Sequence, residues 1–376
     1  MITTKKIIIK KPPPLAGSRL WREKAMKKEK FYLFCLKSVP GLKEALTWEY
    51  LKNGFLPSEL YSSPPQTICH LITKAKLDPN FKAKIRTEFP LYQKALCILD
   101  EEYPKLLKTI FDPPLFLFYQ GNLALLQSEY LVTVVGSRTL SFYHQHALEK
   151  LIADCRQTPL VITSGLAIGI DTLAHEQALA NNLQTIAVLG SGFAKTVFYP
   201  KNNFKLGQQI LKHDGLILSE YPPETKANIY QFPQRNRILA GLSKATLVIS
   251  GTLKSGTLIT AQCALEAGRE VFALPGNINQ TLSEGPNDLI NQGAQILLNA
   301  DSLLKTYDLI TLKQEINLNL DQNQSLVYQA LQIEALSTED LQTKLNFKLA
   351  ILTSVLSQLE LKNLIQLNYF NQWQAK

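Results

Sequence analysis

The segment Leu131-Val132-Thr133-Val134-Val135-Gly136-Ser137-Arg138 joins an uncharged, mostly β-branched run to a turn of small residues and an arginine. Such a run is typical of a strand covered on both faces of a parallel sheet. An apolar face at helical spacing follows it: Ala147, Leu148, Leu151, Ile152 and Cys155. We therefore predict the first βα unit of a doubly wound fold, with an anion site at its turn. The alternative is that Gly136 only permits a tight turn and that Arg138 is a solvated charge.

Strand and helix patterns alternate along the central region. Helical patterns of about ten residues separate the strands, which indicates βαβ crossovers and a mostly parallel sheet. Two short strands precede them, one at residues 95–99 and an edge-like one at 113–119. The main strands are expected at residues 131–135, 160–163, 185–189, 216–219, 245–249, 270–274 and 295–298.

The whole chain of 376 residues is long enough for two or three domains. We expect an α/β protein: an extended Rossmann-like core with a mostly parallel sheet, a small N-terminal helical domain and a C-terminal winged helix. Three amphipathic helices, a capping box at 337–340 and a short hairpin indicate the winged helix. The expected parts are a basic, disordered tail (1–30), a helical domain resembling SAM or helix-hairpin-helix modules (31–95), the core (96–306), a linker (307–320) and the winged helix (321–376).

The net charge of +9 is concentrated in the tail. Residues 1–30 hold ten Lys/Arg and two Glu, a balance of +8, so the rest of the chain sums to +1. Such a tail either binds nucleic acid non-specifically or is a solubilising arm, and the sequence favours the arm.

The cysteines and the apolar runs indicate where the protein works. Five scattered cysteines with no C-x-x-C pair predict reduced thiols in a cytoplasm, with neither a disulfide framework nor a zinc site. No apolar run approaches the roughly 18 residues of a membrane span, and the N-terminus lacks the apolar region of a signal peptide. We expect a cytoplasmic protein without a membrane partner.

Ligands of open α/β sheets bind beyond the carboxyl ends of the strands. Small and polar residues follow five of the expected strands there, so their loops converge on one rim. Glycine lets a bulky anion touch the backbone, and arginine or lysine neutralises phosphate. The loops lie at residues 136–138, 164–167, 190–192 with 199–202, 219–220 with 232–237, and 254–257.

The loop from Phe232 to Arg237 is the most informative of these. An aromatic ring beside Arg235, Asn236 and Arg237 suits single-stranded nucleic acid, in which a base stacks and phosphates pair with guanidinium groups. The alternative is that Phe232 closes the sheet and that an arginine makes a structural ion pair. We expect that alternative for at least one of the arginines, because residues two apart on a helix do not share a face.

Residues for catalysis are scarce. Asp171 and His175 are four apart on an expected helix, but a packing or capping role is favoured over a metal site, for which further ligands are missing. The sequence has no evident Ser/His/Asp set, Walker loop or Gly-x-Gly-x-x-Gly motif. We expect no catalytic residues, no metal and no cofactor.

Together the motifs closely resemble the DNA-processing protein A (DprA/Smf) family. The resemblance rests on residues 135–138, 164–171 with Ala174 and His175, 185–190, 199–202, 232–237, 255–261 and 268–276. It covers about residues 96–306 in register, whereas the flanking domains resemble the family in type only.

The resemblance implies a recombination mediator without catalytic activity. Such a protein binds single-stranded DNA, protects DNA that enters in natural transformation and loads RecA recombinase onto it as a homodimer formed through the Rossmann core. Carried onto this chain, Arg138 and the pair Arg235/Arg237 would hold phosphates and Phe232 would stack a base. The whole implied set is Gly136, Ser137, Arg138, Gly165, Lys201, Phe232, Arg235, Asn236, Arg237 and Lys254.

Several positions depart from the family pattern. Ile168 stands where the family usually has arginine, Ser250-Gly251 where it has Glu-Ala, and Lys43 where the N-terminal hairpin has a second glycine. The chain therefore lacks one basic contact of the family pattern and one glycine of the hairpin that would hold a DNA backbone.

Two other functions remain open. A nucleoside-monophosphate-hydrolysing Rossmann protein has a related motif with a catalytic glutamate, but Thr260 stands at that position here. A nucleotide-binding sensor could use the same pocket without holding a polymer. Residues 321–376 carry four Lys, five Asp/Glu and no arginine, so we expect the winged helix to contact protein and not duplex DNA.

Overall fold

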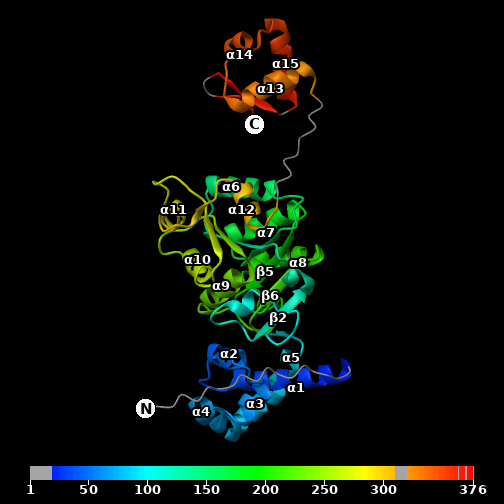
Figure 1. The fold of residues 1–376 in the computed structure, drawn as a ribbon, viewed down its shortest axis with the longest axis vertical. Coiled ribbons are helices and arrows are strands. Elements are labelled where there is room, and N and C mark those ends of the chain that lie inside the picture. Colours follow the sequence, from blue (N-terminus) through cyan, green and yellow to red (C-terminus); the bar gives the residue numbers. More distant parts are fainter. Residues whose placement is uncertain (1–18, 310–319, 363, 369–370, 376) are drawn as a thin grey trace, which may run out of the picture. The chain divides into compact units, whose positions relative to one another are not determined.

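The computed structural model describes residues 19–309, 320–362, 364–368 and 371–375. The chain divides into two compact units, one that ends at Thr311 and one that begins at Leu312 (Figure 1). This division lies within the linker expected at 307–320. Residues 310–319 of that linker and residues 1–18 of the expected tail are outside the described residues.

The first unit contains a nine-stranded sheet in the order β1-β2-β6-β5-β4-β3-β7-β8-β9. Two strand pairs, β1–β2 and β2–β6, are antiparallel, and all the others are parallel. The prediction of a mostly parallel sheet is therefore confirmed. The strands are β1 (Leu96–Cys97), β2 (Phe116–Gly121), β3 (Leu131–Val135), β4 (Val161–Ser164), β5 (Gln184–Leu189), β6 (Leu216–Ser219), β7 (Ala245–Val248), β8 (Glu270–Ala273) and β9 (Gln295–Ile296).

Helices cover both faces of this sheet (Figure 1), so its central strand β3 is buried on both faces. Leu131 and Val135 of β3 belong to the apolar cluster that includes α9 (Gln231–Leu242), α10 (Gly256–Glu266) and α11 (Glu284–Asn291). Val132 and Val134 point into the cluster of the opposite face. That face carries α6 (Phe142–Asp154), α7 (Ile170–Ala180) and α12 (Ala300–Thr306), and α8 (Phe204–Lys212) packs in a third cluster beside β5 and β6. Short 3-10 turns are η1 (Leu107–Thr109), η2 (Leu123–Gln127), η3 (Lys201–Asn203) and η4 (Thr281–Ser283).

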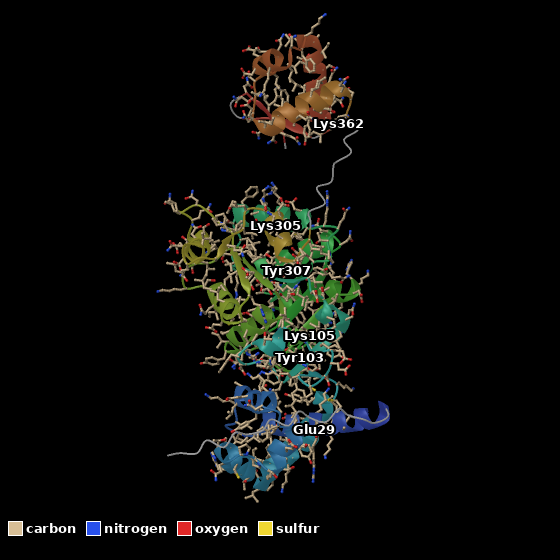
Figure 2. All side chains as sticks on the ribbon, in the orientation of Figure 1. Glu29, Tyr103, Lys105, Lys305, Tyr307 and Lys362 are labelled. Atoms are coloured by element: carbon tan, nitrogen blue, oxygen red, sulfur yellow. The ribbon has the colours of Figure 1, made fainter. Side chains whose placement is uncertain are left out.

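Five N-terminal helices share the core of the first sheet face. The Phe34 ring lies 4.4 Å from that of Tyr92, and the Tyr92 ring lies 5.1 Å from that of Phe116 in β2. Tyr103, between these helices and the sheet (Figure 2), donates to the Pro114 carbonyl at 2.7 Å. The helices are α1 (Arg19–Ser38), α2 (Glu44–Lys52), α3 (Pro57–Ser62), α4 (Gln66–Leu77) and α5 (Pro79–Tyr92).

The structure corrects the expected limit of the basic tail. Helix α1 begins at Arg19, so residues 19–30 are helical and not part of a disordered arm. The lysines of this segment concealed its helical character, but lysine is a good helix former and the segment runs directly into the buried residues Leu33–Leu36.

The edges of the sheet also differ from expectation. The strand expected at 113–119 begins only at Phe116, after two prolines, and β1 pairs with its outer side, so it is not an edge. At the opposite edge β9 has two residues where four were expected. Tyr307, expected in the linker, is buried and donates to the Leu131 carbonyl.

The second unit contains the three helices and the hairpin that the sequence predicts. They are α13 (Gln322–Ile333), α14 (Thr338–Leu345), α15 (Leu349–Leu361), β10 (Ile365–Leu367) and β11 (Trp373–Ala375), with the two strands antiparallel. The capping box is confirmed, because Asp340 N–H donates to Ser337 Oγ at 3.1 Å and Ser337 N–H donates to Asp340 Oδ2 at 3.2 Å. In either unit, no described helix is long and apolar enough to cross a membrane.

We predict that Gly121→Ala destabilises the first unit more than Gly54→Ala. Both glycines have a positive φ, +105° and +92°, so alanine strains either backbone by about 1–2 kcal/mol. A Cβ at Gly121 would lie 2.2 Å from the Gly215 carbonyl oxygen, whereas Gly54 has no atom within 4 Å. Urea denaturation should show a loss of stability at least about 2 kcal/mol larger for Gly121→Ala. Equal urea midpoints for the two variants would contradict the close packing of Gly121, at the end of β2, against Gly215, which precedes β6.

Candidate nucleic-acid interface

A cavity opens at the point where the strand order reverses. The chain moves from β3 through β4 and β5 to β6 on one side, and then returns to β7 on the other side of β3. Such a reversal is where open α/β sheets bind ligands. The cavity of about 290 Å³ lies beyond the carboxyl end of β3, at the beginnings of α9 and α10, and a smaller one of about 30 Å³ adjoins it.

The structure brings most of the predicted residues to this place. Six line the larger cavity, and Gly165 lines the smaller one together with Arg138, Phe232 and Arg235. Lys201, Lys254 and Arg237 line neither, although both lysines are exposed on neighbouring loops. The six are Gly136, Ser137, Arg138, Phe232, Arg235 and Asn236.

Arg138 and Phe232 form the part of the site that faces solvent. The exposed Arg138 guanidinium lies 6.0 Å from the centroid of the Phe232 ring, within the range of a cation–π contact. The Tyr199 ring lies 5.4 Å from the Phe232 ring and lines the smaller cavity. Tyr199 is part of a motif found in the sequence but was not predicted as a site residue. The feature that could have indicated it is an aromatic residue in the loop that follows β5.

Arg235 has a different role from the one expected of it. Its side chain is buried, and Nη1 donates at 2.6 Å to both the Gly165 and the Val188 carbonyl oxygens, at the ends of β4 and β5. Burial lowers the pKa of Arg235, and the charge of Asp171 opposes that shift. Arg235 therefore holds two strand ends together, a role that the sequence did not predict. It also lines both cavities, and its role as a phosphate ligand stays a prediction.

The buried side chain of Arg235 leaves room only for a glycine at position 165. A Cβ at Gly165 would lie 2.1 Å from Nη1 of Arg235, inside the guanidinium group. The glycine therefore makes room for the protein's own cation, and not for the anion that the sequence led us to expect.

Arg237 is also structural. Nη2 lies 2.6 Å from Glu220 Oε1, and Nε lies 3.6 Å from Asp112 Oδ2. Burial raises the pKa of Glu220, and the charge of Arg237 opposes this. The expectation of a structural ion pair is therefore correct for Arg237, whose guanidinium is held by two carboxylates.

The turn after β3 is less open to anions than predicted. Ser137 N–H donates to Ser250 Oγ at 3.0 Å, and Thr139 N–H donates to Ser137 Oγ at 3.0 Å. Helix α6 begins only at Phe142, behind its own cap Ser141. Two amides of the turn are thus already bonded, so the positive charge at this edge comes from the Arg138 side chain.

Asn236 links the two helices that frame the cavity. Its Nδ2 donates to the Gly256 carbonyl at 3.3 Å, and its Oδ1 accepts from Arg235 Nε at 3.3 Å. Gly256 is the first residue of α10, whose N-cap Ser255 accepts from Thr257 N–H at 3.2 Å. Asn236 therefore sets the position of the α10 N-terminus at the cavity.

Asp171 and His175 pack beneath the rim. Asp171 Oδ2 accepts from the amides of Gly165 at 3.1 Å and Ala167 at 3.4 Å, and burial raises its pKa. His175 Nδ1 lies 2.7 Å from Thr185 Oγ1, which itself donates to the Ile162 carbonyl, so Nδ1 carries the proton. Burial and the charge of Arg235 lower the pKa of His175 to about 3.

We predict that Arg235→Ala lowers the free energy of unfolding by about 3–5 kcal/mol, because two buried carbonyls lose their donor and Asp171 loses its compensating charge. Arg138→Ala is the matched control and should stay within about 0.5 kcal/mol of the parent, because Arg138 is exposed. Urea denaturation followed by circular dichroism measures both. If the two variants unfold at the same urea concentration as the parent, Arg235 does not hold the strands.

The pKa of His175 predicts how stability depends on pH. An unfolded chain protonates this imidazole below about pH 6.5, whereas the folded chain does so only near pH 3. Stability should fall as pH decreases between these values, with a contribution from His175 of up to about 1.4 kcal/mol per pH unit. His175→Asn should remove that contribution and flatten the slope. The measurement is the urea midpoint of parent and variant at each pH from 6.5 to 4. If the midpoints of both proteins fall equally with decreasing pH, His175 is not a buried neutral imidazole.

Comparisons with known proteins identify relatives of this chain. A family model described as DNA recombination-mediator protein A matches residues 94–308. The chain is 43% identical over 233 residues to DNA processing protein DprA of Streptococcus pneumoniae, covering 62% of this chain and 79% of that protein. It is 43% identical over 205 residues to protein Smf of Escherichia coli, covering 54% of each.

Two solved structures have the same fold. That of DNA processing protein A from Streptococcus pneumoniae has a TM-score of 0.63 at 38% identity and covers 73% of this chain and 97% of its own. That of DNA processing protein A from Helicobacter pylori, which concerns its single-stranded DNA binding mode, has a TM-score of 0.51 at 32% identity and covers 57% and 94%. The chain belongs to the DNA recombination-mediator protein A family, the DNA-processing protein A (DprA/Smf) family that its motifs resemble.

Proposed function

We propose that this protein binds single-stranded DNA at the cavity beside β3 and acts as a recombination mediator without catalysing a reaction. One observation carries the proposal: the exposed Arg138 guanidinium lies over the Phe232 ring at the mouth of the cavity. A cation next to a half-buried aromatic ring that lines a cavity suits a polymer of bases and phosphates. The Helicobacter pylori relative, whose structure concerns single-stranded DNA binding, supports the same ligand.

The residues divide into those that contact DNA and those that position them. Arg138 pairs with a phosphate and Phe232 stacks a base, while Gly136 and Ser137 let the strand approach the turn. Lys201 and Lys254 are exposed cations that flank its path. The supporting residues are Gly165, Arg235, Asn236 and Arg237, in which Arg235 Nη1, Asn236 Nδ2 and Arg237 Nη2 are bonded within the protein.

The family membership supports the wider role. We propose that the protein works in the cytoplasm as a homodimer formed through the sheet-containing core. In natural transformation it protects incoming DNA and loads RecA recombinase onto it. This part of the proposal rests on the family and not on a described contact.

A nucleotide-binding role is the second candidate. A cavity of about 290 Å³ is at the lower limit of ordinary small-ligand pockets. Hydrolysis is disfavoured, because Thr260 lines the cavity where the related hydrolases have a carboxylate. The carboxylate that does line it, Asp171, is engaged by two backbone amides.

We predict that Arg138→Ala and Phe232→Ala each weaken binding of a labelled dT oligomer about 5- to 150-fold, because a phosphate contact or a stacked base is worth about 1–3 kcal/mol. Lys212→Ala, at an exposed lysine of α8 outside both cavities, should have no such effect. Fluorescence anisotropy over a salt series measures the affinities. Removal of residues 1–18, which precede α1, separates binding by the basic N-terminus from binding by the core.

The same titrations distinguish the alternatives. Equal affinities of Arg138→Ala, Phe232→Ala and the parent would refute the cavity as the DNA site. Loss of all oligomer binding on removal of residues 1–18, together with displacement of a bound mononucleotide analogue only by mononucleotides, would favour the nucleotide-binding role.

The second unit is proposed to contact protein and not duplex DNA. Two of its lysines are engaged, Lys344 with Glu334 at 2.7 Å and Lys362 with Gln324 Oε1 at 2.8 Å. A surface with a net negative charge and no arginine is repelled by a phosphate backbone.

We predict that the full chain and a chain that ends at Thr311 bind a DNA duplex with the same affinity at physiological salt, because the second unit adds no favourable charge. Anisotropy with a labelled duplex is the measurement. A clear loss of duplex affinity in the shorter chain would mean that the second unit reads duplex DNA.

A further inference from the structure

A groove of about 280 Å³ lies on the N-terminal helices, away from the cavity at β3. Its walls are Phe31 and Cys35 of α1, Tyr61 of α3, and Phe81, Ile85 and Phe89 of α5, and we call it the aromatic groove. The Phe31 and Phe89 rings meet edge to face at 5.0 Å. An open groove of this size with aromatic walls is suited to receive a large apolar side chain.

Unpaired cations surround the aromatic groove. Lys82 and Arg86 line it from α5, one helical turn apart, and both are exposed. Lys27 and Lys28 of α1 are exposed and precede Phe31 by four and three residues, which places them on the same side of that helix. Within the part of the chain that the structure describes, these four side chains have no acidic partner.

The acidic residue next to these lysines in sequence, Glu29, is directed elsewhere. Glu29, labelled in Figure 2, accepts from Ser58 N–H of α3 at 2.9 Å. No Asp or Glu is among the residues that line the groove. The groove is therefore apolar inside and positive at its edges.

We propose that the aromatic groove binds an acidic peptide segment of a partner protein, with one or two large apolar side chains inserted between α1 and α5. Carboxylates that flank these anchors pair with Lys82, Arg86, Lys27 and Lys28. Peptide recognition often combines these two features: an apolar groove holds an anchor side chain, and basic residues at its edge pair with acidic residues of the peptide.

The floor of the groove favours a peptide over nucleic acid. Phe81, Ile85 and Cys35 are buried, and burial raises the pKa of the Cys35 thiol to about 12, so the floor stays uncharged. A nucleobase placed there would bury its polar edge against apolar groups without hydrogen-bond partners, which is costly. A leucine or phenylalanine side chain incurs no such cost.

The test uses the full chain and an array of short fluorescein-labelled peptides. The peptides are rich in aspartate and glutamate, and carry one phenylalanine or leucine, or two of them one helical turn apart. Matched peptides replace the apolar anchors by serine, or the acids by lysine. We expect binding that requires both the acids and an anchor.

Charge-reversed variants locate the binding. Lys82→Glu combined with Arg86→Glu should weaken binding of the acidic, anchored peptide at least tenfold, because two ion pairs are lost and replaced by repulsion. The control is Lys74→Glu combined with Lys84→Glu, the same change of charge at exposed lysines of α4 and α5 that do not line the groove. It should change the affinity less than threefold.

Three outcomes would overturn the proposal: no acidic, anchored peptide binds; the serine-substituted peptides bind equally well; or both double variants weaken binding to the same extent. A fourth outcome would also overturn it: a dT oligomer displaces the peptide from the parent protein but does not displace it from the Arg138→Ala variant. The peptide would then occupy the DNA site. The proposal does not depend on DNA binding at β3, so either can fail alone.

Discussion

The buried guanidinium of Arg235 is the interaction on which the candidate site depends. One nitrogen of this side chain is bonded to the carbonyl oxygens of Gly165 and Val188, so it joins the carboxyl ends of β4 and β5. The buried charge is stabilised because Nη1 bonds two carbonyls and the charge of Asp171 lies near it. The rim that carries the exposed site residues thus rests on a buried cation.

This arrangement places residues for stability and for binding on one helix. Phe232 lies at the first turn of α9 and lines both cavities, and Arg235, which also lines them, uses Nη1 to bond the ends of β4 and β5. Arg237 is held by the carboxylates of Glu220 and Asp112. Arg235 is held by backbone carbonyls at the ends of β4 and β5. The cation that remains for a ligand comes from another element, the turn after β3 that carries Arg138.

Most of the fold could be predicted from periodicity, because the sheet buries β-branched runs on both faces. The strand at 131–135 was predicted to the residue, and its neighbours to within about one residue. The roles of the arginines could not be predicted, since an arginine has the same sequence signature whether its side chain contacts a phosphate or a backbone carbonyl. Only the spatial approach of Gly165 and Val188, 70 and 47 residues away, reveals what Arg235 does.

The same limit applies to the basic segment at the N-terminus. Its charge indicated a solvated arm, yet α1 places Lys30 3.3 Å from Asp100 at the β1 end and leaves Lys27 and Lys28 beside an aromatic groove. Charge counted along a sequence gives a total, whereas recognition depends on which cations remain unpaired after folding. Two groups of such cations have different surroundings: Arg138 lies over the Phe232 ring at the end of β3, whereas Lys82 and Arg86 border a groove with a buried apolar floor. Because these surroundings differ although the charge is the same, the first place suits bases and phosphates and the second suits apolar anchors and carboxylates.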